Sequence, residues 1–166
     1  MASILNVDQI NNAAGTSALT IDSSGNVQIP GHVIQVVEDS TTTEESTTST
    51  SSGSQKISAL SVNITPTSTS SKILVLVSLQ TYNNTNAASM YANLFKDGSQ
   101  LTSAGNAIRH YIAGNTAVMS ASFNYLDSPA TTSQITYDIR YYVSGGTGYI
   151  SVNSGQSSIT VMEIAG

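Results

Sequence analysis

The residues of this chain that could catalyse a reaction are a few scattered carboxylates. Cleavage of a glycosidic bond would need two carboxyl groups about 5 to 9.5 Å apart. The candidates for such a pair are Glu44, Glu45, Asp127, Asp138 and Glu163.

Most of these carboxylates fit structural roles better than catalytic ones. Glu44 and Glu45 lie in a polar segment rich in serine and threonine, and Asp127 precedes a Ser-Pro turn. Asp138 lies on the polar face of an alternating run, two residues before Arg140. We therefore expect no catalytic pair among them.

Glu163 alternates with the apolar residues Ile159 and Val161 in the last run of the chain. A carboxylate on such a face requires a partner, because an unpaired buried charge is costly. We expect an ion pair with Arg109 or Arg140 rather than an acid catalyst.

The segment Arg109-His110-Tyr111 is the one local cluster that could suggest a catalytic triad or an anion site. No serine lies in a nucleophile-elbow context such as G-x-S-x-G. His32, after Pro30 and Gly31, is expected at the edge of a strand. The two distant histidines and the absence of cysteine give no metal-binding spacing and no thiol nucleophile. We expect no enzyme, no cofactor and no metal.

Composition excludes further classes. Only 9% of the 166 residues are charged, the net charge is -5, and the five cations are scattered. No basic patch could neutralise phosphates, so nucleic acid is not an expected partner. No secretory signal and no apolar run of about 18 residues is present, so no membrane partner is expected.

Strand periodicity dominates the rest of the chain. Apolar residues alternate with polar ones over 117–125 and 135–143, which we interpret as antiparallel neighbours separated by Pro129. Two shorter runs, 149–152 and 158–164, are expected to meet across Asn153-Ser154-Gly155.

Further strands are expected at 57–64, 72–82 and 90–95, the last entering an Asp97-Gly98 hairpin turn. The polar segment that follows Val37 is interpreted as a long surface excursion with some strand. With eight or more strands and no helical spacing, the sequence predicts an all-β fold with very little helix. An antiparallel two-sheet jelly-roll sandwich fits best.

The strand 72–82 is apolar on both faces, because Leu74 and Leu76 oppose the main stripe. A neighbouring subunit would cover the second face, and the alternative is coverage by an edge loop or the N-terminal segment. Phe123, Tyr137 and Tyr141 are likewise assigned to core or trimer packing. Three other tyrosines, Tyr82, Tyr91 and Tyr142, are candidates for receptor contact.

Residues 1–31 are expected to form an extended N-terminal arm and hairpin, and residues 32–166 a jelly-roll head. An isolated hairpin is marginally stable in water, so this unit requires a partner. Its apolar residues are the candidates for attachment: Ile4, Leu5, Val7, Ile10, Leu19 and Ile21.

Several segments carry a resemblance: NITPTSTSSKILVLVSLQ, LFKDGSQL, YLDSPATTSQITYDI, SSITVMEIAG and the opening SILNVDQINNAAGTSALTIDSSGNVQIPG. The chain resembles small virion surface proteins and tail-fibre modules of tailed bacteriophages, with trimeric jelly rolls of the complement and tumour-necrosis-factor type. The resemblance implies a homotrimer on the virion surface, assembled in the host cytoplasm. Its partners would be the major capsid protein or tail components.

Two roles remain open. In the first, the chain is a capsid decoration or cement protein whose arm grips the shell. In the second, it is the receptor-binding tip of a short tail fibre that contacts a host surface glycan or protein.

Overall fold

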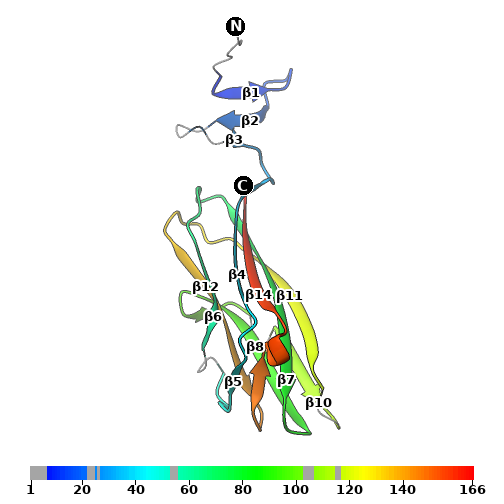
Figure 1. Cartoon of the computed structure of the whole chain (residues 1–166). Helices are drawn as coiled ribbons and strands as arrows, with labels where there is room; N and C mark the ends of the chain where they lie inside the picture. The colour runs from blue at the N-terminus through cyan, green and yellow to red at the C-terminus, as the bar shows by residue number, and fades with distance from the viewer. Residues whose placement is uncertain (1–6, 22–24, 26, 53–55, 103–106, 115–116) are drawn as a thin grey trace.

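The computed structural model describes residues 7–21, 25, 27–52, 56–102, 107–114 and 117–166. They form a small N-terminal sheet and an elongated β-sandwich, joined by a short connection near residues 29–32 (Figure 1). The C-terminus lies at the same junction.

The N-terminal sheet contains β1 (Gln9–Asn11), β2 (Ser17–Ile21) and β3 (Val27–Gln28). The sandwich contains β4 (Val33–Thr41), β5 (Glu45–Thr47), β6 (Lys56–Ile64), β7 (Lys72–Asn83), β8 (Ala88–Lys96), β9 (Ser99–Gln100), β10 (Ile108–Ile112), β11 (Met119–Asp127), β12 (Ile135–Val143), β13 (Gly148–Ile150) and β14 (Ser157–Ile164). Within the described ranges the one helical turn is a 3-10 turn at Val152–Ser154. The prediction of an all-β sandwich with very little helix is confirmed.

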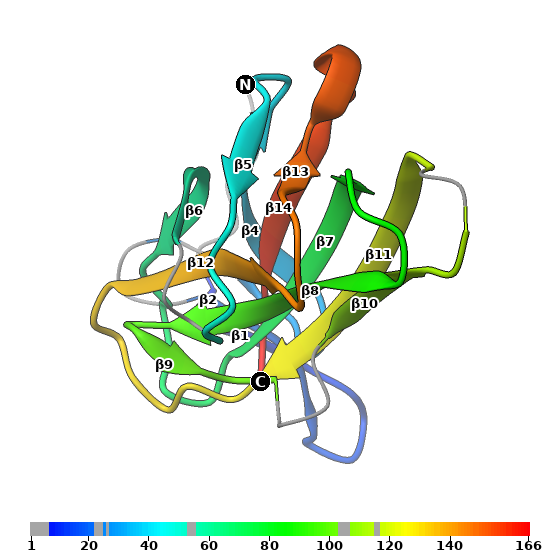
Figure 2. The same ribbon diagram turned by 90° about the horizontal axis from the view of Figure 1, so that it is seen from below.

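The strands pair in a nested order. β4 pairs with β14, β6 with β12, β7 with β11, and β8 with β10, all antiparallel. Further pairing of β14 with β7 and of β12 with β8 completes two sheets. Figure 2 shows these two layers from the end of the head away from the N-terminal sheet. This nesting of first strand with last is a long hairpin rolled on itself, the jelly-roll arrangement.

We call the layer of β4, β14, β7 and β11, with β13 and β5, the first sheet, and the layer of β6, β12, β8 and β10, with β9, the second sheet. The interpretation of 117–125 and 135–143 as neighbours is therefore wrong. β11 pairs with β7 in the first sheet, whereas β12 lies in the second. The connection that contains Pro129 therefore crosses from one layer to the other. The apolar sides of β11 and β12 face each other across the core, each from its own sheet.

The pairing expected between 149–152 and 158–164 is also wrong. β13 and β14 both pair antiparallel with β7, at Thr81 to Asn83 and at Lys72 to Ser78. They run in the same direction along one edge of β7, separated by the 3-10 turn. The polar excursion after Val37 does contain strand, as expected, because β5 pairs with β13. The Asp97-Gly98 hairpin is also confirmed, with φ values of 47° and 82°.

The core lies between the two sheets. The first sheet contributes alternate residues such as Ile73, Val75 and Val161, and the second contributes Leu94 and Ile139 among others. All five side chains are fully buried. The alternation seen in the sequence thus corresponds to one inner and one outer face per strand.

Two fully buried tyrosines of β12 differ in how their hydroxyls are satisfied. The Tyr137 hydroxyl donates to Oδ2 of Asp127 at 2.6 Å, and the same oxygen accepts from Nζ of Lys96 at 2.8 Å. The Tyr141 hydroxyl is buried without a hydrogen-bond partner among the described residues. Burial raises the pKa of both phenols, and for Tyr137 the hydrogen bond to Asp127 raises it further.

We expect Tyr137→Phe and Tyr141→Phe to differ in their effect on the free energy of unfolding, measured by urea denaturation. Loss of the charge-assisted hydrogen bond in Tyr137→Phe should lower the free energy of unfolding by about 1.5 to 3 kcal/mol. Tyr141→Phe removes a hydroxyl without a partner and should be neutral or stabilising. Equal losses in the two variants would contradict this account.

Candidate functional site

The N-terminal sheet has one apolar face. Ile10 lies opposite Leu19, and Ile21 lies opposite Val27, so these four side chains share that face. Ile10 and Val27 remain 46% and 44% exposed. Covering the apolar side of this small sheet would stabilise it, because burial removes apolar surface from water.

The sequence-predicted attachment residues divide into two groups. Ile10, Leu19 and Ile21 lie together on this face, and Val7 is half-buried just before β1. Ile4 and Leu5 lie outside the described residues. Their assignment to attachment stays a prediction. The strand β1 itself was not expected, because three residues give too short an alternation to detect in a sequence.

Backbone hydrogen bonds fasten the N-terminal sheet to the head. The amide of Gly31 donates to the carbonyl of Ala165 at 2.7 Å, and the amide of Ala165 donates to the carbonyl of His32 at 2.9 Å. Gly31 has a φ of 83°, which is readily adopted only by glycine. His32, expected at a strand edge, lies here, and its Nδ1 lies 2.5 Å from the carbonyl oxygen and 3.2 Å from the amide nitrogen of Ile29.

The outer face of the first sheet carries an apolar row at the end nearest the N-terminal sheet. Register places Val36, Met162, Leu74 and Leu126 side by side across four strands. Val36 is 55% exposed and Leu126 is 51% exposed. Leu76 lies one row further along, 36% exposed. We call these five residues the apolar row.

Beyond the apolar row the same face is hollowed. Ser78 lies two residues beyond Leu76 on β7, with Ser158 and Ser122 beside it on the neighbouring strands. The small side chains of these serines leave a depression of 350 Å³ bordered by Leu76 and Thr160. The described charged residues of β7, β11 and β14 do not line it. The depression itself is lined by uncharged residues, while Glu38 of β4 and Lys72 of β7 lie elsewhere on the same outer face.

The other residues assigned to core or trimer packing lie inside the sandwich. Tyr137 and Tyr141 are fully buried in the core. Phe123 is half-buried on the inner face of the edge strand β11, packed against the core. Leu74 and Leu76, by contrast, face outward. Their position opposite the main apolar stripe of β7 is the one that the alternation along 72–82 predicted.

Two of the three receptor-contact tyrosines come together on the outer face of the second sheet. The rings of Tyr91 and Tyr142 stack with centroids 4.6 Å apart. Arg109 lies opposite Tyr91, and its guanidinium carbon is 5.7 Å from the ring centroids of both Tyr91 and Tyr111. We call Arg109, Tyr91, Tyr111 and Tyr142 the arginine–tyrosine cluster.

Tyr82 lies apart from this cluster. It belongs to β7 in the first sheet and packs against Tyr149, with ring centroids 5.6 Å apart. Both rings are half-buried. The sequence did not indicate this separation, because membership of a sheet is set by long-range pairing.

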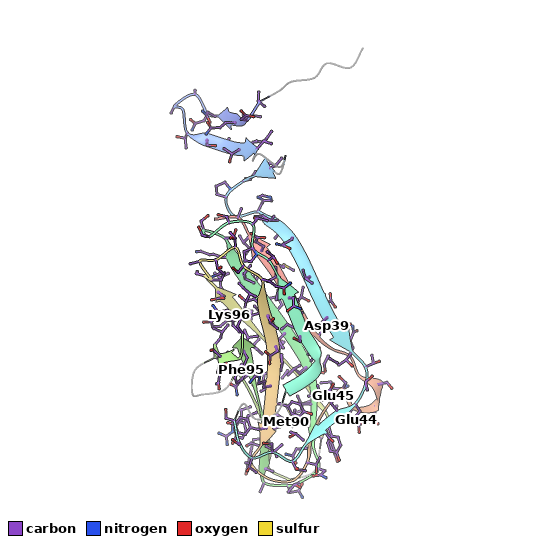
Figure 3. All side chains as sticks on the ribbon, turned by 90° about the vertical axis from the view of Figure 1, so that its left-hand side faces the viewer. Asp39, Glu44, Glu45, Met90, Phe95 and Lys96 are labelled. Carbon is purple, nitrogen blue, oxygen red and sulfur yellow. The ribbon has the colours of Figure 1, made fainter. Side chains whose placement is uncertain are left out.

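Two of the candidate carboxylates are engaged by basic side chains. Asp127 binds Lys96 and Tyr137, and Asp138 binds Arg140 at 2.7 Å. Figure 3 shows Glu44 and Glu45 near the end of the head opposite the N-terminal sheet. Among the described residues no group of three or more histidine, aspartate or glutamate side chains could hold a metal ion.

The expected ion pair of Glu163 is wrong. Its carboxylate accepts hydrogen bonds from the side-chain amide of Gln35 and from both the backbone amide and the hydroxyl of Thr67, at 2.7 and 2.8 Å. β14 lies in the first sheet, whereas Arg109 and Arg140 lie in the second. Burial alone would raise the pKa of Glu163, but these neutral donors outweigh it and lower the pKa.

His110 is buried on the inner face of β10. Its Nδ1 lies 3.0 Å from the hydroxyl oxygen of Thr81, and that hydroxyl donates to the carbonyl of Met119 at 3.2 Å. Since a hydroxyl has one hydrogen, it accepts a second bond from Nδ1–H of the neutral imidazole. Burial lowers the pKa of His110. These contacts include neither a carboxylate nor a serine, as a triad would require.

Comparisons with known proteins add a distant likeness of fold. No protein-family model matches the sequence, and no curated protein is significantly similar to it. Structures of infectious bursal disease virus, from the Gt and Gx strains, match with TM-scores of 0.41 and 0.40 at 13% and 14% identity. The matches cover 98% and 96% of this chain but 52% and 41% of the viral chains.

A crystal structure of the VP2 subviral particle of the same virus matches with a TM-score of 0.38 at 14% identity. The match covers 98% of this chain and 51% of that one. The chain thus spans about half the length of the structures it matches, or less. No described helix is long and apolar enough to cross a membrane.

The lowered pKa of His110 predicts a loss of stability in mild acid. The unfolded chain, with a histidine pKa of about 6.5, binds a proton before the folded chain does. The free energy of unfolding should therefore be constant above neutral pH and decrease as the pH falls below about 6.5. Urea unfolding between pH 7.5 and 5 should show this decrease.

The control for this measurement is a pair of variants. His110→Gln should remove the decrease, whereas His32→Gln should retain it. A decrease that persists unchanged in His110→Gln would assign it to other groups.

Proposed function

We propose that this chain is a non-enzymatic structural protein of a tailed-phage particle, a homotrimeric capsid decoration or cement protein. The observation that carries the proposal is the uncovered apolar face of the N-terminal sheet, at one end of the head. Docking of this face onto a larger body would remove its apolar side chains from water, and the sandwich would then project from that body.

The junction at residues 29–32 supports such a display. The two backbone hydrogen bonds between Ala165 and the Gly31-His32 segment tie the arm to the end of β14. Ile29 and His32 add a third backbone bond of 3.1 Å across the turn. A force that pulls on the arm would therefore be transmitted to β4 and β14, which pair over eight residues.

The apolar row supports oligomerisation. It faces outward on the first sheet, at the end where the arm begins, so copies joined there would have their arms close together. Burial of apolar surface contributes about 25 cal/mol per Å², so covering this row would contribute several kcal/mol to the free energy of association. In a cyclic trimer each subunit would present this face to the edge of the next, a heterologous contact that closes into a ring.

The compact arm favours the capsid over the tail. Its described residues form a three-stranded sheet close to the end of the head (Figure 1), and a compact arm suits direct attachment to a shell.

The alternative is the receptor-binding tip of a short tail fibre. The arginine–tyrosine cluster favours it, because exposed aromatic side chains and arginine are enriched where proteins recognise partners. The Tyr91 end of β8 also lies toward the end of the head opposite the arm, as its neighbour Met90 shows in Figure 3. Copy number per particle distinguishes the two roles.

We expect Leu19→Asp to abolish retention on phage particles, because it places a charge on the apolar face of the arm. The matched control is Thr20→Asp, which adds the same charge on the opposite face of the same strand and should be retained. Retention is measured by density-gradient sedimentation of particles, with immunogold labelling to locate and count the protein.

Hundreds of copies over the shell would support decoration, and a few trimers at the tail would support the alternative. Equal retention of both variants would contradict attachment through this face.

Trimer formation is tested separately. Leu126→Asp should convert the free protein from three times the 17.2 kDa chain mass to a single chain mass, as measured by sedimentation equilibrium. The control Asn63→Asp introduces the same charge at an exposed position on the second sheet and should leave the trimer intact. A wild-type monomer, or a trimeric Leu126→Asp variant, would contradict the assignment of this interface.

A further inference from the structure

We propose that the arginine–tyrosine cluster binds a carboxylate-bearing sugar residue of a surface polysaccharide. This inference goes beyond the proposed function, since it concerns the head alone and holds whether the head projects from a shell or from a tail. The site belongs to the outer face of the second sheet, on the strands β10, β8 and β12.

The site is built by strand register. Arg109 lies opposite Tyr91, and Tyr91 lies opposite Tyr142, so the three side chains form a row across three strands. Tyr111 is two residues beyond Arg109 on the same face and is 52% exposed. Met90, Ala92 and Leu94 fill the core from the opposite face of β8, which fixes this row toward solvent.

The guanidinium of Arg109 is contacted by a serine and two tyrosine rings, and it forms no ion pair with a carboxylate among the described residues. Its Nε donates to the hydroxyl of Ser89 at 3.3 Å, and Ser89 is 2% exposed. The rings of Tyr91 and Tyr111 confine it by cation–π contact. Among the described residues the ion pairs are Lys96 with Asp127 and Arg140 with Asp138, and Arg109 takes part in neither.

Arg109 is exposed and has no carboxylate partner among the residues that the structure describes, although the chain has a net charge of -5. The guanidinium fork matches a carboxylate bidentately, with charge-assisted hydrogen bonds. Because its side chain is already ordered by Ser89 and two rings, little conformational entropy remains to be lost on binding. We therefore assign to the ligand a negative charge, carried by a carboxylate that the guanidinium of Arg109 would bind.

The tyrosines define the rest of the ligand. Each tyrosine offers an apolar ring face with a hydroxyl at its tip, which suits a sugar ring with apolar C–H faces and polar edges. Tyr91 and Tyr142 stack face to face, with planes inclined by 19°, so each ring covers one face of the other. The apolar ring surface beside the cation is offered mainly by Tyr111, which is 52% exposed. A pyranose that bears a carboxylate fits both features.

A nucleic acid strand fits less well. Affinity for a phosphate backbone comes from several cations along a track, and this site has one. The other arginine of the sheet, Arg140, forms an ion pair with Asp138. Its guanidinium carbon lies 4.1 Å from the ring centroid of Phe95. The tyrosine rings alone would contribute stacking with bases but not the electrostatic attraction to phosphates.

The test uses the full-length protein and saturation-transfer-difference NMR with methyl β-D-glucuronide as the probe. Methyl β-D-glucoside is the matched neutral sugar. We expect millimolar binding of the glucuronide and at least tenfold weaker binding of the glucoside. Arg109→Gln should weaken glucuronide binding at least tenfold, and Tyr111→Ala should weaken it severalfold.

The matched control is Lys72→Gln, which removes the same charge from an exposed position on the other sheet and should leave binding unchanged. Equal binding of glucuronide and glucoside, or full affinity in Arg109→Gln, would overturn the proposal. No glucuronide binding by the wild-type protein would overturn it as well. Binding of oligothymidylate through Arg109 in place of the sugar would assign the cluster to nucleic acid instead.

Discussion

The antiparallel pairing of β4 with β14 is the constraint on which most of this structure depends. It joins the first strand of the head to the last over eight residues and so closes the roll of nested strand pairs. Loop-closure entropy opposes contacts this far apart in sequence, and the buried apolar residues on both sheets repay it. Within that pairing Gln35 reaches Glu163, which lets a fully buried carboxylate stay ionised without a cation.

The same pairing sets the position of the arm. Because β14 ends at the start of β4, the backbone of Ala165 is available to the Gly31-His32 segment. The N-terminal sheet thus emerges at the end of the head where the apolar row of the first sheet also lies (Figure 1). An arm tied at both strands favours a fixed direction of projection over a flexible tether.

The two outer faces differ in chemistry although both belong to one sandwich. The first sheet presents an uncharged apolar row and a depression lined by serines, while the second presents an arginine among tyrosines. Apolar rows stabilise contact between copies, since burial is non-directional. Arginine with aromatic rings gives directional recognition instead. Because the two lie on opposite faces, an oligomer formed through the apolar row, as we propose, would leave the arginine–tyrosine cluster uncovered.

The sequence alone determined the strand character of the head, the rarity of helix, the Asp97-Gly98 hairpin and the apolar stripes that became the core. These features depend on residues close in sequence, where alternation and turn chemistry act directly. Only the tertiary structure decided which strands are neighbours. It separated β11 from β12, gave Glu163 neutral donors instead of an arginine, and brought Arg109 beside Tyr91, Tyr111 and Tyr142. Alternation reports that a strand has an inner and an outer face, but it carries no information on the partner strand, because pairing is selected by the joint burial of the whole core.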